Sequence, residues 1–391
     1  MDGPSVREAA VVIVGAGPAG LSAAIALRQR GAGRVIVYER ELRAGGVPRH
    51  TDHLGYGLRD LHRVMTGPKY AARLVRAAER AGVEIEVSRA VHSFVDRVVT
   101  TNGAGGPESV TAGAIILATG VRERPRAARL VPGDRPAGVF TTGALQQFTA
   151  IHRQRVGNRA VIVGAEHVSF SAVLTLTHAG CAVAAMVTPL PRHQTYEPLR
   201  IATSSRHRVP IHTGVEIAEI VGRTRVEAVV LSDGRHIECD TVVFTGDWIP
   251  DHELARSAGL PMTATAKSPV VDSGWHTPQP GVFAIGNLTH PAETADVCAL
   301  GGRAAAAHVM DWLTLQTWPT EVTPIVVEPP ISWAAHTANG ITLRVSNFVK
   351  GRIECRVGDE VLHQTGHREW TPNRAIHLPS IGNVRSIRLL Q

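Results

Sequence analysis

The chain has 391 residues, 44% hydrophobic and 19% charged, which is typical of a soluble globular protein of about two to four domains. This composition excludes a disordered chain, a collagen-like fibre and a small scaffold held by disulfides. The formal net charge is +7, and the basic residues are spread along the chain, so the sequence indicates no nucleic-acid-binding patch.

The first apolar stretch covers residues 9–27, about the length of a membrane span. Its centre carries Gly15, Gly17, Pro18 and Gly20, which favour a strand, a tight turn and a helix over a spanning helix. The N-terminus shows no signal-peptide pattern. We therefore expect a cytoplasmic protein without a membrane segment.

A dinucleotide-binding fingerprint lies in this stretch. Residues 15–20 read G-A-G-P-A-G, a complete G-x-G-x-x-G. They follow a β-branched strand at residues 10–14 and precede a helix at residues 21–30. A second strand at residues 34–38 ends at Glu39, which completes the βαβ context that makes the fingerprint specific.

Each fingerprint residue has a physical role in binding a dinucleotide. Gly15 permits the tight turn, Gly17 lets backbone amides approach a pyrophosphate, and Gly20 lets helix and strand pack closely. The helix N-terminus faces the phosphates. Glu39, 24 residues after Gly15, is expected to accept hydrogen bonds from a ribose.

Further along the chain, an apolar strand at residues 114–117 is followed by A-T-G at residues 118–120. Residues 242–246 repeat the pattern of an apolar strand ending in Thr-Gly. Residues 281–287 predict a last strand of the first domain, and residues 295–310 predict a helix. The pattern indicates that a second unit is inserted within the first.

The inserted unit resembles the first in spacing. A strand at residues 159–163 is followed by G-A-E-H-V-S at residues 164–169, a helix, and a strand at residues 181–187. Gly164 and Thr188 are again 24 residues apart. The chain therefore reads as a duplicated βαβ unit.

The fingerprint of the second unit is damaged. Glu166 replaces its second glycine and Ser169 its third, and a carboxylate there repels a pyrophosphate. Thr188 stands where NADH needs an acidic ribose ligand, whereas Arg192 could hold the 2′-phosphate of NADPH. Two alternatives stay open: an NADPH site, or a nucleotide fold kept as a scaffold.

These motifs together resemble those of flavoproteins with two dinucleotide-binding domains, which carry a glycine pair such as Gly45-Gly46 after the acidic residue. The resemblance implies that the first fold binds FAD, with Asn287 at the ribityl chain in place of the usual Asp. The residues it implies at FAD are Gly15, Gly17, Pro18, Ala19, Gly20, Glu39, Arg40, Gly45, Gly46, Val47, Val91, Ala118, Thr119, Gly120, Gly286, Asn287, Asp296 and Val297.

Over residues 8–312 the chain resembles the pyridine nucleotide-disulfide oxidoreductase superfamily in its thioredoxin-reductase-like form. Residues 118–125 and 131–144 are similar to segments in FAD subunits of amine and amino-acid dehydrogenases, such as sarcosine oxidase alpha, opine oxidase and hydrogen cyanide synthase. Residues 45–58 are similar to a segment of oxidoreductases associated with anaerobic glycerol 3-phosphate metabolism, in which a Cys is common at the place of Thr51.

The implied fold class is α/β, with two Rossmann-like dinucleotide-binding domains and a small C-terminal β domain. We expect an FAD domain at residues 1–120 and 247–315, an inserted NAD(P)-like domain at 121–246, and the β domain at 316–391. Trp333 and Trp370 are expected to anchor the core of the β domain. Its short strands are predicted at residues 341–345, 352–357, 375–378 and 384–390.

The cysteines argue against disulfide chemistry. Members of the superfamily that reduce disulfides need a C-x-x-C motif, and this sequence has none. The four cysteines are Cys181, Cys239, Cys298 and Cys355. We expect reduced, buried thiols, and we predict neither a disulfide reductase nor a metal site.

A flavin accepts the hydride itself, so the protein supplies orientation and a base for the substrate's N–H or O–H proton. His50 and His53 follow the glycine pair in a loop expected beside the flavin, and we predict them as the catalytic residues. The alternative is that both are loop histidines that pack or bind water. His290 and Glu293 are expected to face the substrate or to cap the helix that follows.

Three arginines after residue 120 are candidates to hold a substrate carboxylate or, alternatively, to form a basic surface hinge. They are Arg122, Arg124 and Arg126.

Three functions fit the sequence. The first is an FAD-dependent oxidoreductase that takes a hydride from a small amine, amino acid or hydroxy acid. The second is an NAD(P)H-dependent reductase that passes electrons to a small molecule, a quinone or a partner protein. The third is a flavin-bound relay or scaffold subunit of a dehydrogenase complex. We expect a small-molecule substrate, and a homodimer or a subunit of such a complex.

Overall fold

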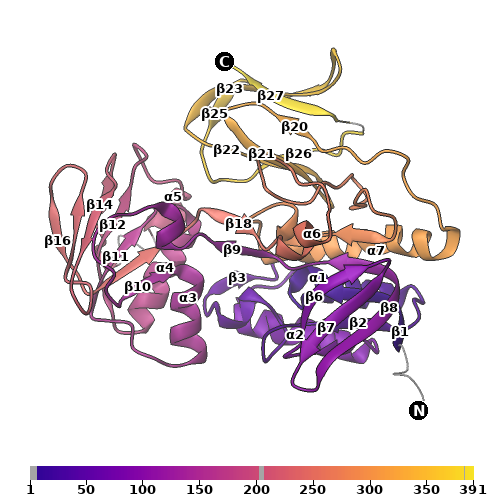
Figure 1. The fold of residues 1–391 in the computed structure, drawn as a ribbon. Coiled ribbons are helices and arrows are strands. Elements are labelled where there is room, and N and C mark those ends of the chain that lie inside the picture. The colour runs from indigo at the N-terminus through magenta and orange to yellow at the C-terminus, as the bar shows by residue number, and fades with distance from the viewer. Residues whose placement is uncertain (1–6, 202–206, 383) are drawn as a thin grey trace.

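The computed structural model describes residues 7–201, 207–382 and 384–391. Figure 1 shows three bodies: one built from the first 120 residues and the long helix α7 (Ala295–Leu315), a second beside it, and the C-terminal strands above both. The predicted helix at residues 295–310 is thus part of a longer one that ends at Leu315.

The first body is a seven-stranded sheet in the order β5-β2-β1-β8-β7-β6, with β19 pairing β8. Its strands are β1 (Arg7–Val14), β2 (Val35–Tyr38), β5 (Glu84–Glu86), β6 (Ala90–Val95), β7 (Val98–Gly103), β8 (Gly106–Leu117) and β19 (Val282–Ala284). The strands β5, β2, β1, β8 and β19 pair in parallel, whereas β6, β7 and the first half of β8 form an antiparallel meander.

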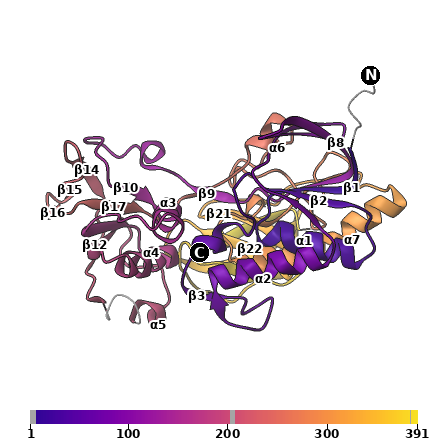
Figure 2. The ribbon, with the colours of Figure 1, turned by 90° about the horizontal axis from the view of Figure 1, so that it is seen from below.

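Both faces of the parallel strands are covered, so their β-branched residues are buried without alternation. Helices α1 (Pro18–Gln29), α2 (Gly67–Arg80) and α7 pack on one face and lie side by side in Figure 2. The contact between α1 and α7 needs a glycine, because a Cβ atom on Gly302 would lie 2.2 Å from the carbonyl oxygen of Ala19.

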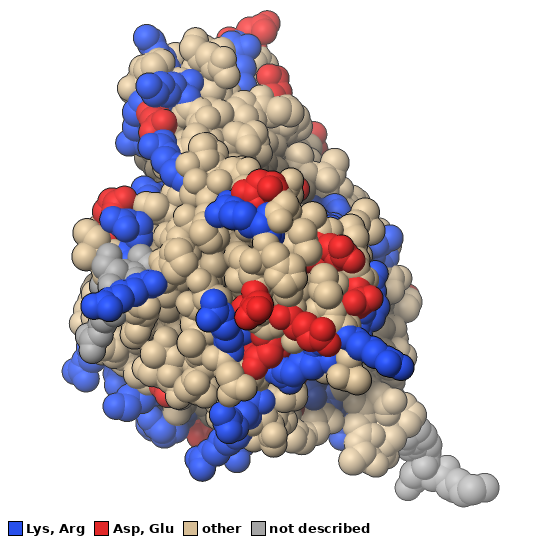
Figure 3. Space-filling model, turned by 90° about the vertical axis from the view of Figure 1, so that its left-hand side faces the viewer, with Lys and Arg blue, Asp and Glu red and all other residues tan. Residues whose placement is uncertain are grey.

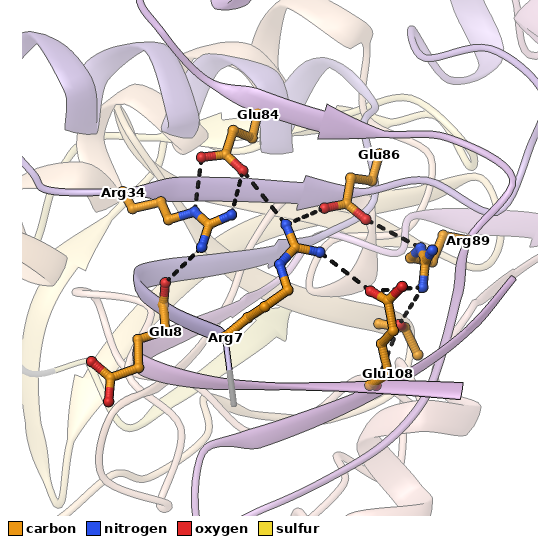
Figure 4. Close-up of polar contacts among 8 residues, drawn as sticks. Arg7, Glu8, Arg34, Glu84, Glu86, Arg89 and Glu108 are labelled. Atoms are coloured by element: carbon orange, nitrogen blue, oxygen red, sulfur yellow. Dashed lines mark hydrogen bonds and ion pairs between the residues drawn. The ribbon is translucent and has the colours of Figure 1, made fainter. Parts of the chain in front are cut away.

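Charged side chains form ion pairs between strands of this sheet (Figure 4). Arg7 of β1 donates to Glu86 of β5 at 2.6 Å and to Glu108 of β8 at 3.3 Å. Arg34 binds both oxygens of Glu84 at 2.8 Å. The network therefore links three strands through partly exposed ion pairs.

The second body contains a five-stranded parallel sheet in the order β10-β17-β11-β12-β13 and an antiparallel sheet, β14-β15-β16. The parallel strands are β10 (Val139–Thr141), β11 (Arg159–Val163), β12 (Ala182–Thr188), β13 (Ile211–Thr213) and β17 (Thr241–Phe244). The antiparallel strands are β14 (Ile217–Val221), β15 (Ala228–Leu231) and β16 (His236–Glu238). Helices α3 (Thr142–Gln146), α4 (His167–His178) and α5 (Glu197–Arg200) belong to the same body.

The chain crosses between the first two bodies on an antiparallel pair, β9 (Val121–Glu123) and β18 (Trp248–Pro250). The domain boundaries predicted at residues 120 and 247 lie at this crossing. Short elements nearby are the hairpin of β3 (Leu54–Tyr56) and β4 (Met65–Thr66), and helix α6 (Glu253–Ser257).

The C-terminal body has two sheets. One contains β20 (Val326–Val327), β27 (Ser386–Leu390), β23 (Val349–Val357), β24 (Glu360–Gln364) and β25 (Arg368–Trp370), and the other β21 (Ile331–Thr337), β22 (Gly340–Val345) and β26 (Ile376–Leu378). Trp370 is buried in the core of this body, as predicted. The prediction for Trp333 was wrong, because its ring packs with Ala335 against Ala266 of the neighbouring body and so belongs to the seam.

All four cysteines are free and buried, as predicted. Burial raises the pKa of Cys181, Cys239 and Cys355 to about 11 in each case, so these thiols stay protonated near neutral pH. Basic and acidic side chains are intermixed on the face shown in Figure 3. None of the helices in the described part of the chain is long and apolar enough to cross a membrane.

Candidate functional site

The turn between β1 and α1 has the geometry of a phosphate-binding turn. Gly15 adopts φ +107°, and a Cβ atom there would lie 2.4 Å from the carbonyl oxygen of Ala118. A Cβ atom on Gly20 would lie 2.0 Å from the carbonyl oxygen of Gly15. Gly17 is the N-cap of α1, and apart from its two chain neighbours no heavy atom of the described residues lies within 4 Å of the position of its Cβ. The first amides of α1 therefore face open space suited to an anion.

Segments far apart in the sequence meet at the start of α1. A Cβ atom on Gly46 would lie 2.8 Å from the Cα of Gly17, and one on Gly286 would lie 2.6 Å from the Cβ of Ala19. Both glycines have positive φ, of +63° and +68°. The glycine pair and the strand end at Gly286 are thus brought against the fingerprint turn.

Glu39 lies at the end of β2, and its carboxylate is buried. Its two oxygens accept hydrogen bonds from the backbone N–H groups of Ala16 at 3.1 Å and Glu41 at 3.0 Å. The carboxylate therefore stabilises the fingerprint turn and the loop that follows β2. Each oxygen keeps a further lone pair for a hydroxyl donor.

The loop before α7 is closed by two of the predicted residues. Asn287 donates to the carbonyl of Glu293 at 3.1 Å and accepts from its N–H at 2.9 Å. Asp296, in the first turn of α7, accepts from the N–H groups of Gly57 at 2.9 Å and Arg59 at 2.8 Å. Both side chains thus fix the loops that surround the N-terminus of α7.

His290 lies in this loop and is fully buried. Neither of its ring nitrogens has a hydrogen-bond partner among the described residues. A neutral imidazole has one donor and one acceptor, and leaving such a group unpaired in the interior costs about 1–3 kcal/mol. The ring is therefore an unpaired polar group in the interior of the first body. The sequence had offered His290 only as one of two alternatives.

The two predicted catalytic histidines differ in environment. His50 is 4% exposed, and burial, aided by Arg49, lowers its pKa to about 4. Its Nδ1 has no partner among the described residues. His53 is more exposed, and its Nδ1 lies 2.8 Å from the carbonyl oxygen of Leu54.

The arginines near the crossing pair are bound to protein groups. Arg40 and Arg122 both pair with Asp251, at 2.7 and 3.0 Å. Arg124 pairs with Asp247 at 3.2 Å, and Arg126 donates to backbone carbonyls of the following loop. Arg126 is buried, so it does not lie on a basic surface hinge, and the role of Arg122 and Arg124 stays a prediction.

The remaining predicted residues take varied places. Val91 lies on β6 and packs at the edge of the core, Gly120 borders open space, and the Thr119 hydroxyl donates to the carbonyl of Asp251 at 2.7 Å. Val297 lines a cavity between α7 and the C-terminal body.

The corresponding turn of the second body is filled by its own side chain. The Oε2 atom of Glu166 accepts a hydrogen bond from the N–H of Ala165 at 3.0 Å. Its Oε1 atom is buried without a partner among the described residues, and a Cβ atom on Gly246 would lie 2.8 Å from it. The carboxylate therefore lies over the turn that a pyrophosphate would need to approach.

A second carboxylate lies close by. Glu123 accepts a hydrogen bond from the N–H of Gly143 at 2.8 Å, and burial raises its pKa to about 7, with Glu166 adding to the effect. Arg129 donates to the carbonyls of Thr245 and Gly246 at 3.0 and 2.7 Å. The turn thus has two acidic groups near one another.

Arg192, the residue proposed for a 2′-phosphate, is engaged elsewhere. It pairs with Glu369 of the C-terminal body at 2.5 Å and lies over the ring of Phe348 at 4.2 Å. Thr188 is buried, and its hydroxyl accepts from the N–H of Leu190 at 3.4 Å. The guanidinium of Arg192 is thus held toward the C-terminal body, and Thr188 is buried at the end of β12.

The C-terminal body contacts both nucleotide folds through arginines. Arg344 donates to the carbonyl of Ala292 at 2.6 Å and pairs with the buried Glu293 at 3.0 Å. Arg374 donates to the carbonyls of Gln194, at 2.6 Å, and Thr195. This body therefore joins the loop before α7 to a loop of the second body.

The chain is similar to known proteins over most of its length. Residues 9–309 match the family model described as pyridine nucleotide-disulphide oxidoreductase. The chain belongs to this family. The match includes both nucleotide folds. The chain is an FAD-dependent oxidoreductase.

Two curated relatives and one solved structure illustrate the range of proteins to which this chain is similar. The ferredoxin–NAD(+) reductase component of the biphenyl dioxygenase system of Paraburkholderia xenovorans (strain LB400) is 30% identical over 294 residues, covering 71% of this chain and 67% of the relative. An opine oxidase subunit from Agrobacterium tumefaciens (strain Ach5) is 26% identical over 354 residues, covering 81% and 68%. The thioredoxin reductase of T. acidophilum has a TM-score of 0.66 at 22% identity, covering 78% of this chain and 98% of that one.

Proposed function

We propose that this protein is an FAD-dependent dehydrogenase that oxidises a small amine, amino acid or hydroxy acid. The observation that carries the proposal is the Glu166 carboxylate, which lies over the nucleotide turn of the second body. An anion in that place disfavours a pyrophosphate, so reduction by a nicotinamide dinucleotide is disfavoured as well. The reducing electrons then come from another substrate.

The residues of the first fold fit FAD. The N-terminus of α1 at Gly17 suits the pyrophosphate, and the buried Glu39 suits a ribose. When bound, the flavin supplies the acceptor for a hydride from the substrate carbon.

The protein must also handle the proton that leaves the substrate nitrogen or oxygen. His50 is neutral at pH 7, because its pKa is about 4, and its Nδ1 can accept a hydrogen bond. A base with so low a pKa holds a proton only weakly, so His50 is suited to orienting the substrate. His53, on the same loop and more exposed, is then the candidate proton acceptor.

A second candidate function is favoured by the relatives. Several are named as reductase components that act with ferredoxin, so an NAD(P)H-dependent reductase with a protein partner is the main competitor. The opine oxidase match favours a related arrangement, in which this chain works as one subunit of a dehydrogenase. In either case we propose a partner subunit or a homodimer as the working form.

The experiment is an anaerobic titration of the purified flavoprotein, followed at the visible flavin band. We expect no bleaching by NADPH or NADH within minutes, and bleaching by at least one member of a panel of amines, amino acids and hydroxy acids. Rapid bleaching by NADPH would instead establish the reductase function. Size-exclusion chromatography with light scattering on the same sample reports whether the chain forms a dimer.

A further inference from the structure

A cavity of about 220 Å³ lies between helix α7 and the C-terminal body. Its apolar wall comes from two distant parts of the chain, Val297 and Leu300 on α7, and Ile341 and Leu378 on β22 and β26. Arg59 and His377 contribute polar groups to the lining, as does the turn at residues 337–339. The C-terminal body is therefore needed to form this cavity.

Arg59 is fixed by its backbone and free at its side chain. Its N–H donates to the buried carboxylate of Asp296 at 2.8 Å. The next residue, Asp60, is anchored in the interior, where it accepts from the Tyr70 hydroxyl at 2.9 Å and pairs with Arg303 at 3.1 Å. No hydrogen bond or ion pair joins the Arg59 guanidinium to another part of the chain that the structure describes. A cation thus stands at the cavity on a rigid backbone.

His377 lies at the same cavity with one nitrogen committed. Its Nδ1 lies 2.8 Å from the hydroxyl of the buried Thr342, which fixes the plane of the ring. The Nε2 atom remains as a second polar group in the lining of the cavity. Such a combination, an apolar wall with a few fixed polar groups, is typical of a small-molecule site.

We propose that this cavity binds a small organic carboxylate, with its apolar body against α7 and β22 and its carboxylate on Arg59. A guanidinium binds a carboxylate through two parallel hydrogen bonds. The volume of about 220 Å³ and the apolar wall suit a small branched or aromatic carboxylate. The ligand is either the substrate of the oxidation or an effector. The binding of a carboxylate does not depend on the proposed function. Only the assignment of this carboxylate as the substrate rests on the proposed function.

The binding test uses isothermal titration calorimetry of the oxidised holoprotein with benzoate and 4-methylpentanoate. 4-Methylpentanamide serves as the uncharged control. We expect binding of a carboxylate, no binding of the amide, and at least about tenfold weaker binding by Arg59→Ala. The matched control is Arg63→Ala, which removes an exposed arginine of the same loop and should bind as the native protein does. Leu300→Trp, which fills the cavity, should also abolish binding.

Several results would overturn the site: no heat with either carboxylate, equal binding of the amide, or unchanged binding by Arg59→Ala. Unchanged flavin absorbance and melting temperature in each variant show that it is folded. The second arm adds leucine and 2-hydroxy-4-methylpentanoate anaerobically. Bleaching that Arg59→Ala weakens identifies the ligand as substrate, and binding without bleaching identifies an effector. If the carboxylates bind but no member of the amine, amino-acid and hydroxy-acid panel bleaches the flavin, the proposed function fails while the site stands.

Discussion

The two nucleotide folds of this chain share their βαβ spacing and differ at two glycine positions of the fingerprint, where the second fold carries Glu166 and Ser169. In the first fold, Gly17 leaves the helix N-terminus open, because apart from its chain neighbours no described residue lies within 4 Å of its Cβ position. In the second, Glu166 stands at the corresponding place and folds its carboxylate back onto the N–H of Ala165. The comparison teaches that a βαβ unit can keep its fold while a side chain of its own turn occupies the place where an anion would bind.

The largest expected effect comes from copying the second fold into the first. Gly17→Glu places a carboxylate at the open turn, where it repels the pyrophosphate of FAD. We expect FAD affinity to fall by roughly a thousandfold, about 4 kcal/mol. The ratio of flavin to protein absorbance in the purified variant measures this. Gly105→Glu, on an exposed turn, should purify fully yellow, and a yellow Gly17→Glu protein would refute the assignment of the turn.

The next effect concerns how the C-terminal body supports the first fold. Arg344→Ala leaves the Glu293 carboxylate buried and unpaired, because its side chain is only 2% exposed. Removing one partner of a buried pair costs roughly 3–5 kcal/mol. Chemical unfolding measures the loss, and Arg344→Ala combined with Glu293→Gln should recover part of it. Arg385→Ala breaks an exposed pair and should cost less than about 1 kcal/mol.

A smaller effect concerns the acidic groups of the second fold. Burial raises the pKa of Glu123 from 4.5 to about 7 in the folded protein. The unfolded chain therefore ionises first, and the contribution of Glu123 to stability falls as pH rises from about 4.5 to about 7. At 1.36 kcal/mol per pKa unit this amounts to about 3 kcal/mol above pH 7.

Glu123→Gln should thus stabilise the protein at pH 8 and leave it nearly unchanged at pH 4.5. Melting temperatures across this range test the prediction. Glu216→Gln, at an exposed position of the same body, is the control and should show no such pH dependence. Equal effects of Glu123→Gln at both pH values would mean that the carboxyl of Glu123 does not cause the pH dependence of stability.

The smallest expected effect comes from reopening the second fold. Glu166→Gly removes the carboxylate that lies over the turn, but Ser169 and Thr188 still lack the groups that favour a dinucleotide. We expect a gain in NADPH affinity of about tenfold, or 1.4 kcal/mol, and the appearance of slow flavin bleaching. Glu216→Ala should show no gain. If NADPH already bleaches the flavin of the native protein rapidly, Glu166 does not keep a nicotinamide dinucleotide out of the second fold.

Much of the fold could be predicted from local patterns. The strand at residues 159–163 was predicted with the observed bounds, and the predicted strand at residues 181–187 is shifted by one residue. The helix at residues 295–310 was predicted too short, because the chain past residue 310 is held helical by packing that local periodicity does not reveal. In this last part of α7, Trp312 donates to the carbonyl of Gly113 at 2.9 Å.

The sequence by itself determined the two βαβ units, the acid in the second fingerprint and the absence of a C-x-x-C motif. These depend on residues close together in the chain, where turn geometry and side-chain periodicity act locally. The tertiary structure alone decided which polar side chains form hydrogen bonds or ion pairs within the protein. Asp296 binds the amides of residues 57 and 59, and Arg192 binds Glu369, because folding brings these distant segments together. The burial of His290 and the cavity at Arg59 have the same origin, since each is formed by contacts between elements that no local pattern encodes.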